Sequence, residues 1–63
     1  MANTLEILNF FEYTHLPPYL QQMSKKFHDL AHQIVAEVPR NDERDAALRK
    51  LLEAKDAAVR AKI

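Results

Sequence analysis

Two histidines, His28 and His32, have the spacing at which two imidazoles on one helix face can share a metal ion. A zinc-hydrolase motif also needs a glutamate beside the first histidine and a third ligand further along the chain. Asp29 follows His28 instead, and no histidine follows His32, while the remaining histidine, His15, falls in an expected loop. We therefore interpret the pair as histidines that flank the core stripe of a helix, and we predict no metal site.

The chain also lacks the residue combinations that activate a nucleophile. Its candidate hydroxyl groups, on Thr4, Thr14 and Ser24, have no base at a suggestive spacing, and cysteine is absent. Glycine is absent as well, so glycine-rich phosphate loops and dinucleotide-binding fingerprints cannot be present in recognisable form. The sequence predicts a protein that is not an enzyme and carries no cofactor.

An aromatic and proline-rich segment, residues 10–18, comes directly before the longest helical pattern, and Lys25 and Lys26 follow within that pattern. Aromatic rings stack on nucleobases, at roughly 1–3 kcal/mol per base, and lysines and helix N-termini attract phosphates. The alternative is that the phenylalanines of this segment belong to the core, that Tyr13 is partly buried, and that both lysines are simply solvated.

The proline pair Pro17-Pro18 marks the start of a long helix, because the residue before a proline avoids the helical region while proline itself suits the first turn. Apolar residues then recur at gaps of three and four until Pro39 ends the pattern. This periodicity predicts a helix over about residues 18–38. Its apolar positions are Leu20, Met23, Phe27, Leu30, Ala31, Ile34, Val35 and Val38.

A second helix is predicted over about residues 42–62, after a connection of a few residues. Asn41 or Asp42 can serve as its N-cap, and acidic residues in its first turn suit the helix macrodipole. The helix carries two adjacent apolar stripes, one rich in alanine and one rich in leucine. The alanine-rich stripe comprises Ala47, Leu51, Ala54 and Ala58, and the leucine-rich stripe comprises Leu48, Leu52 and Val59.

The segment before the prolines has a less regular pattern of apolar residues. We predict a short helix that starts at Leu5, with Asn3 or Thr4 as its cap. An extended piece is expected to follow it, over about Phe10–Thr14.

Two long helices with a short connection pack antiparallel. The expected fold class is therefore all-α: a single domain over residues 1–63, built as an antiparallel two-helix hairpin with a short helical or extended N-terminal segment. A chain of 63 residues without cysteine is rarely stable through one small core alone. Because the second helix has two apolar stripes and only one long partner helix, we expect the protein to assemble into a homo-oligomer.

Charge and hydropathy exclude several classes of partner. Nine basic and nine acidic residues cancel, whereas general nucleic-acid binders usually carry a basic excess, so no polymeric nucleic acid is expected as a partner. The apolar runs are far shorter than the ~20 residues that span a bilayer, and no membrane partner is expected. Residues 1–11 also lack the basic start of a secretion signal. These features predict a cytosolic protein.

Motifs along the chain form a combined pattern: Phe11-x-Tyr13, Pro17-Pro18, a helix ending in Ile34-x-x-x-x-Pro39, and Arg44-x-x-Ala47-Leu48-x-Lys50-Leu51-x-Glu53-Ala54. Over roughly residues 10–61 this pattern resembles the hairpin-domain family of bacteriophage anti-CBASS proteins. Members of that family are small helical proteins that form hexamers and sequester cyclic oligonucleotides, the second messengers of bacterial CBASS signalling. The resemblance implies a hexamer that binds cyclic dinucleotides or trinucleotides, without degrading them, in the cytoplasm of an infected bacterial host.

The resemblance also implies roles for individual residues. Tyr13, with Phe11 nearby, would stack on a base of a cyclic dinucleotide, and a basic residue early in the long helix would contact a phosphate. Lys25 and Lys26 are both candidates for that contact. A separate family pocket for cyclic trinucleotides uses basic residues late in the last helix, where Arg60 is the nearest candidate.

This chain departs from the family in two places. Residues 56–59 read Asp-Ala-Ala-Val where many members carry Met-Trp-x-Asn, and the last helix ends earlier, so the second pocket is in doubt. An alternative function stays open: a structural or regulatory hairpin that binds a partner protein through an apolar helix face.

Overall fold

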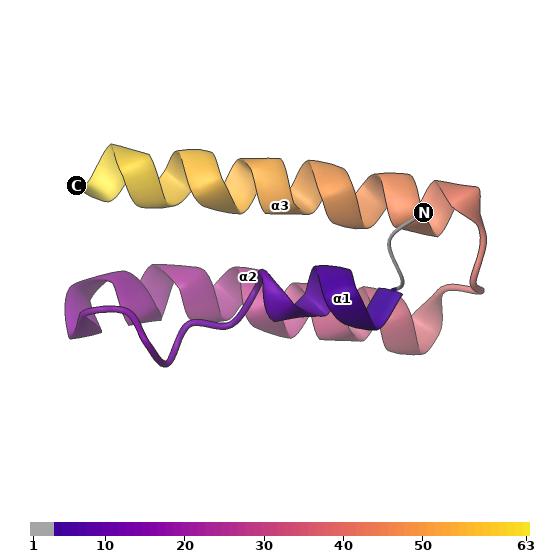
Figure 1. Ribbon diagram of the computed structural model, residues 1–63, viewed down its shortest axis with the longest axis horizontal. Helices are drawn as coiled ribbons and strands as arrows, with labels where there is room; N and C mark the ends of the chain where they lie inside the picture. Colours follow the sequence, from indigo (N-terminus) through magenta and orange to yellow (C-terminus); the bar gives the residue numbers. More distant parts are fainter. Residues whose placement is uncertain (1–3) are drawn as a thin grey trace.

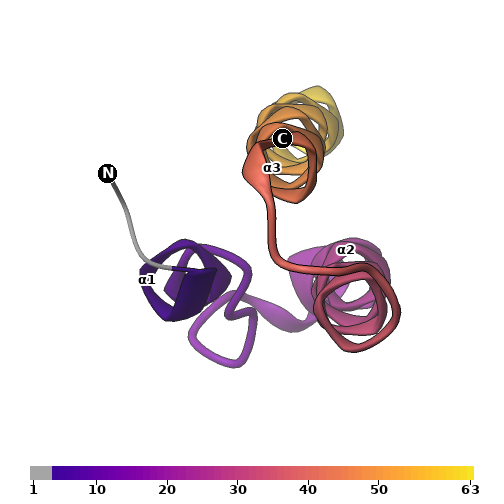
Figure 2. The same cartoon turned by 90° about the vertical axis from the view of Figure 1, so that its right-hand side faces the viewer.

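A computed structural model describes residues 4–63 of the chain, with side chains from residue 6 onward. The described chain forms three helices, α1 (Thr4–Asn9), α2 (Pro18–Glu37) and α3 (Asp42–Lys62), and it contains no strand. α2 and α3 run antiparallel, and α1 lies along the same side of both (Figure 1). Seen end-on, the three helices occupy the corners of a triangle (Figure 2). The all-α class and the helical hairpin are confirmed.

α2 begins where the proline pair predicts. Pro18 occupies the first turn, and Pro17 precedes the helix with polyproline-like backbone angles (φ −57°, ψ 150°), as expected of a residue before proline. At the other end Val38 leaves the helix (φ −108°, ψ 134°) directly before Pro39. The helix predicted over about 18–38 is therefore confirmed to within one residue. No helix among residues 4–63 has both the length and the apolar character needed to cross a bilayer.

α3 begins at a side-chain cap. The Oδ1 atom of Asn41 accepts a hydrogen bond of 2.8 Å from the backbone N–H of Arg44, which satisfies one of the free donors at the helix start. Of the two predicted candidates, Asn41 is the N-cap and Asp42 is the first helical residue. Acidic residues fill the first turn and basic residues the last, an arrangement that the helix dipole favours. The helix predicted over about 42–62 is confirmed.

The N-terminal segment agrees with the prediction in part. A short helix is present, and Thr4 is its first described residue; the proposed cap Asn3 lies outside the described residues. The extended piece predicted over Phe10–Thr14 is wrong, because turns occupy most of that stretch. Backbone hydrogen bonds such as Phe11 N–H to the Leu8 carbonyl (3.0 Å) hold these turns.

The core lies where the three helices meet. The side chain of Phe11, just beyond α1, is fully enclosed there, with 0% of its surface exposed. The core therefore depends on the turn after α1 as well as on the hairpin. Its buried members are Leu8, Phe11, Ala31 and Leu48, with Ile7, Phe27, Ile34, Val35, Leu51 and Leu52 packed around them.

The two apolar stripes of α3 have different environments. In the leucine-rich stripe Leu48 is fully buried and Leu52 is half-buried, because this stripe faces the core. In the alanine-rich stripe Ala47 and Ala54 are exposed. One protomer thus leaves part of the second stripe uncovered. Assembly into a homo-oligomer stays a prediction.

Two charged side chains of α3, Arg44 and Lys55, are buried, which the sequence pattern did not predict. Arg44 donates from Nη1 to the carbonyls of Val35 (3.3 Å) and Val38 (3.1 Å) at the end of α2. Lys55 donates from Nζ to the carbonyl of Phe10 (2.6 Å) in the turn after α1. Arg44 therefore satisfies carbonyls at the end of α2, and Lys55 satisfies a carbonyl of the turn that follows α1.

Candidate functional site

The loop between α1 and α2 positions Tyr13, and the first turns of α2 hold the loop in place. The side-chain amide of Gln21 donates to the carbonyl of Leu16 at 2.7 Å and to that of Thr14 at 3.3 Å. Within the loop, the N–H of Leu16 donates to the carbonyl of Tyr13 at 3.0 Å. These bonds fix the path of the backbone from Tyr13 to Leu16.

Tyr13 is the first of three rings that line one side of α2. Its ring packs edge-to-face against His28, with centroids 5.1 Å apart and an interplanar angle of 71°, a favoured geometry for ring pairs. His28 in turn packs against His32, one helical turn later, with centroids 4.4 Å apart. Tyr13 and His28 are half-buried, while His32 is exposed. We call Tyr13, His28 and His32 the ring row.

Lys25 lies on the same face of α2 as the two histidines, because residues three, four and seven apart share a helix face. Its ammonium group forms an ion pair of 3.3 Å with Asp29. The other carboxylate oxygen of Asp29 lies 3.1 Å from Nδ1 of His28. The hydrogen bond from His28, followed by that from Lys25, holds the pKa of Asp29 below its ordinary value of 3.8. The cation is thus linked to the ring row through Asp29.

Lys26 has a different position. One residue further along a helix corresponds to a rotation of about 100°, which moves Lys26 away from the histidine face and toward the side of Leu30. The sequence left open which of the two lysines would contact a phosphate. Of the two, Lys25 shares the α2 face of His28 and His32 and is linked to His28 through Asp29.

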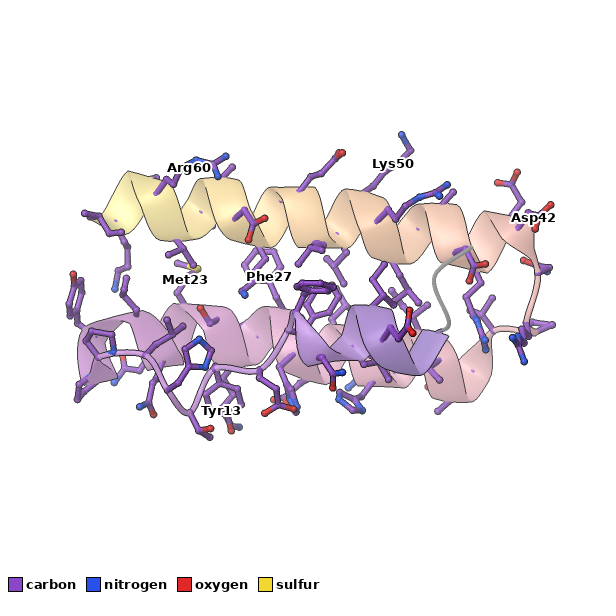
Figure 3. The ribbon with its side chains drawn as sticks, viewed as in Figure 1. Tyr13, Met23, Phe27, Asp42, Lys50 and Arg60 are labelled. Carbon is purple, nitrogen blue, oxygen red and sulfur yellow. The ribbon has the colours of Figure 1, made fainter. Side chains whose placement is uncertain are left out.

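Phe11 and Arg60 do not join the ring row. Phe11 is enclosed in the core, so its ring is not accessible to a ligand in this arrangement of the chain. Arg60 is exposed on α3, and Figure 3 shows it on the outer side of that helix, whereas Tyr13 lies beyond α2 on the opposite side of the molecule. Of the five residues that the sequence suggested for ligand binding, one protomer therefore brings together Tyr13 and Lys25.

The two histidines are the residues that sequence reasoning did not assign to this site. Their spacing was clear, but the contact of His28 with Tyr13 depends on how the loop returns along α2, which no local pattern encodes. Among the described residues, no three His, Asp or Glu side chains are grouped so that they could hold a metal ion. Ser24, one of the candidate hydroxyl groups, is fully buried.

This arrangement suits recognition of an aromatic anion. An exposed imidazole and a half-buried phenol offer ring surfaces for stacking, and an exposed ammonium group one turn from His28 offers a charge for a phosphate or carboxylate. Comparison with known proteins gives no significant match: no family model, curated protein or solved structure is similar to this chain.

Proposed function

We propose that this protein binds and sequesters cyclic oligonucleotide second messengers, in the first place cyclic dinucleotides, and returns them unchanged. The observation that carries this proposal is the ring row with Lys25 beside it, a stacking surface and a cation on one face of a hydrogen-bonded scaffold. The similarity of the sequence motifs to the anti-CBASS hairpin family supplies the class of ligand.

In this proposal a base stacks on the accessible surface of Tyr13 and His32, which contributes roughly 1–3 kcal/mol per base. A phosphate of the ligand takes the place of the Asp29 carboxylate at the ammonium group of Lys25. Charge-assisted hydrogen bonds of this kind are stronger than neutral ones. Neither step needs a nucleophile or a metal ion, so the ligand is held and not cleaved.

A cyclic dinucleotide has two bases and two phosphates, whereas one protomer offers one ring row and one Lys25. Two copies related by a two-fold axis would match both halves of such a ligand. The proposed active form is therefore a homo-oligomer, and by resemblance a hexamer. Its proposed role is to lower the concentration of free messenger in the cytoplasm of an infected bacterium and so to block CBASS-type signalling.

The test is a calorimetric titration of the purified protein with a panel of cyclic di- and trinucleotides. We expect at least one member to bind, and we expect Tyr13→Ala to weaken it by about 10–100-fold because a stacking surface is lost. Tyr13→Phe is the matched control, since it keeps the ring and should retain most of the affinity. Binding that is equally strong in the alanine variant, or absent throughout the panel, would overturn the proposal.

A second candidate function rests on a separate observation. Leu30 on α2 is 44% exposed, and helical periodicity places it on the same side of the hairpin as the exposed alanines of α3. The hairpin therefore offers an apolar face to a helix of another protein. In that case Leu30→Glu would abolish partner binding, whereas Tyr13→Ala and Lys25→Ala would leave it intact.

A further inference from the structure

The hairpin has an apolar face that no other element of the described chain, residues 4–63, covers. α1 lies on one side of the α2–α3 pair, and the opposite side is open (Figure 2). Helical periodicity places apolar residues of both long helices at this side, on either side of the seam between them. We call this surface the open face; its exposed members are Leu30 from α2 and Ala47 and Ala54 from α3, and the half-buried Met23, Ile34, Leu51 and Ala58 border it along the seam, where Ile34 and Leu51 also pack against the core.

Charged residues border the open face, and their order along the helices determines which arrangement of two copies brings unlike charges together. Lys26 and Glu37 lie along its α2 edge, and Glu43 and Lys50 lie along its α3 edge. All four side chains are exposed, and within the part of the chain that the structure describes none of them forms an ion pair. Because the helices run antiparallel, both glutamates fall near the α2–α3 connection and both lysines fall further from it. The open face thus has an acidic end and a basic end.

We propose that a second copy of this chain covers the open face, with the two-fold axis in the interface and perpendicular to the helices. This axis reverses the partner end for end, so that α2 packs antiparallel against α2 of the partner. Lys26 then lies opposite the partner's Glu37, and Lys50 lies near the partner's Glu43. The apolar residues of the two faces form the middle of a four-helix arrangement, and the alanines permit close approach of α3 to its copy.

Charge decides between this axis and the other two-fold arrangement that would bury the same face. An axis parallel to the helices would keep both acidic ends at the same level. Glu37 would then lie beside the partner's Glu43, and like charges placed together disfavour such pairing. The perpendicular axis instead brings unlike charges together at both ends of the interface.

The pairing leaves the ring row accessible. Lys25, His28 and His32 lie on the opposite side of α2 from Leu30, by the rotation of about 100° per residue. This pairing is a different contact from the two-fold contact that the proposed function places at the ring row, and it does not depend on ligand binding. A failure of one is therefore distinguishable from a failure of the other.

The test measures the dimer dissociation constant by sedimentation equilibrium. Lys26→Glu and Glu37→Lys each place like charges at two symmetry-related positions, and each should weaken association by about tenfold. The double variant Lys26→Glu/Glu37→Lys restores unlike pairs and should recover most of the wild-type affinity. Recovery requires that the two residues face each other across the axis, so a double variant that is as weak as the singles would overturn the proposed orientation.

Two further variants complete the experiment. Leu30→Glu should give a folded monomer, with its helix content verified by circular dichroism, while Arg49→Glu on the outer side of α3 should leave association unchanged. A wild-type chain that stays monomeric at millimolar concentration would overturn the proposal outright. Dimers that survive in Leu30→Glu would show that another surface is used, and would overturn it as well.

Discussion

At the scale of single residues, Asp29 competes with a ligand for Lys25. Its carboxylate accepts from the ammonium group at 3.3 Å and also meets the imidazole of His28. An incoming phosphate must displace this carboxylate, and the negative charge of Asp29 also repels the phosphate directly. Asp29 is therefore expected to limit affinity while keeping Lys25 oriented when no ligand is bound.

The variant Asp29→Asn should therefore bind an anionic ligand several-fold more tightly, because Lys25 loses its competitor and one negative charge is removed. Titration calorimetry with the tightest cyclic nucleotide of the panel measures this change. Glu53→Gln removes a charge from the outer side of α3 and serves as the control. Unchanged or weaker binding in Asp29→Asn would show that Lys25 is not the anion contact.

Asp29 also links stability to pH. Its pKa is lower in the folded chain than its ordinary value of 3.8, chiefly through the hydrogen bond from His28. Its contribution to stability is therefore present above that pH and is lost as the pH falls through the lowered pKa. Urea unfolding should show that the stabilities of wild type and Asp29→Asn differ at pH 6 and that this difference shrinks as the pH falls below 3.8. The difference should be small because the carboxylate is exposed, and a difference that stays constant across this range would contradict the assignment.

At the scale of elements, Arg44 ties the end of α2 to the start of α3. Arg44 is 7% exposed. The guanidinium group donates hydrogen bonds to carbonyls at the end of α2, and the backbone N–H of Arg44 donates to the side chain of the N-cap residue Asn41. Arg44→Met keeps much of the apolar stem but leaves those carbonyls without their donor. We expect a loss of about 1–3 kcal/mol in the free energy of unfolding, measured with urea. Arg49→Met, on the exposed side of the same helix, should change it by less than about 0.5 kcal/mol.

The same elements show what a sequence can and cannot predict. Both long helices were predictable because prolines and an N-cap mark their ends and because their apolar residues recur at helical spacing. The burial of Arg44 and Lys55 was not, since each depends on a carbonyl that comes from another element. The same holds for the candidate site. Residue type singled out Tyr13 and the pair Lys25 and Lys26, but it did not distinguish the two lysines, and the contact of Tyr13 with His28 depends on the path of the loop.

At the scale of the whole molecule, the two long helices present two different surfaces. The ring row with Lys25 occupies one side of α2, and the open face lies on the other. If association buries the open face, the folded state is stabilised by mass action. The melting temperature of the wild type should then rise with protein concentration, whereas that of Leu30→Glu should not. Equal concentration dependence in scanning calorimetry would contradict a role for the open face.

The measurement that tests the central claim most directly is capture followed by release. The protein is mixed with a limiting amount of the cyclic dinucleotide that it binds best, freed of unbound ligand by filtration, and denatured by heat. Mass spectrometry of the released fraction should recover the ligand intact and in fixed ratio to the protein, with much less ligand captured by Tyr13→Ala. Recovery of linear or cleaved nucleotide, or capture that does not depend on Tyr13, would contradict sequestration by the ring row.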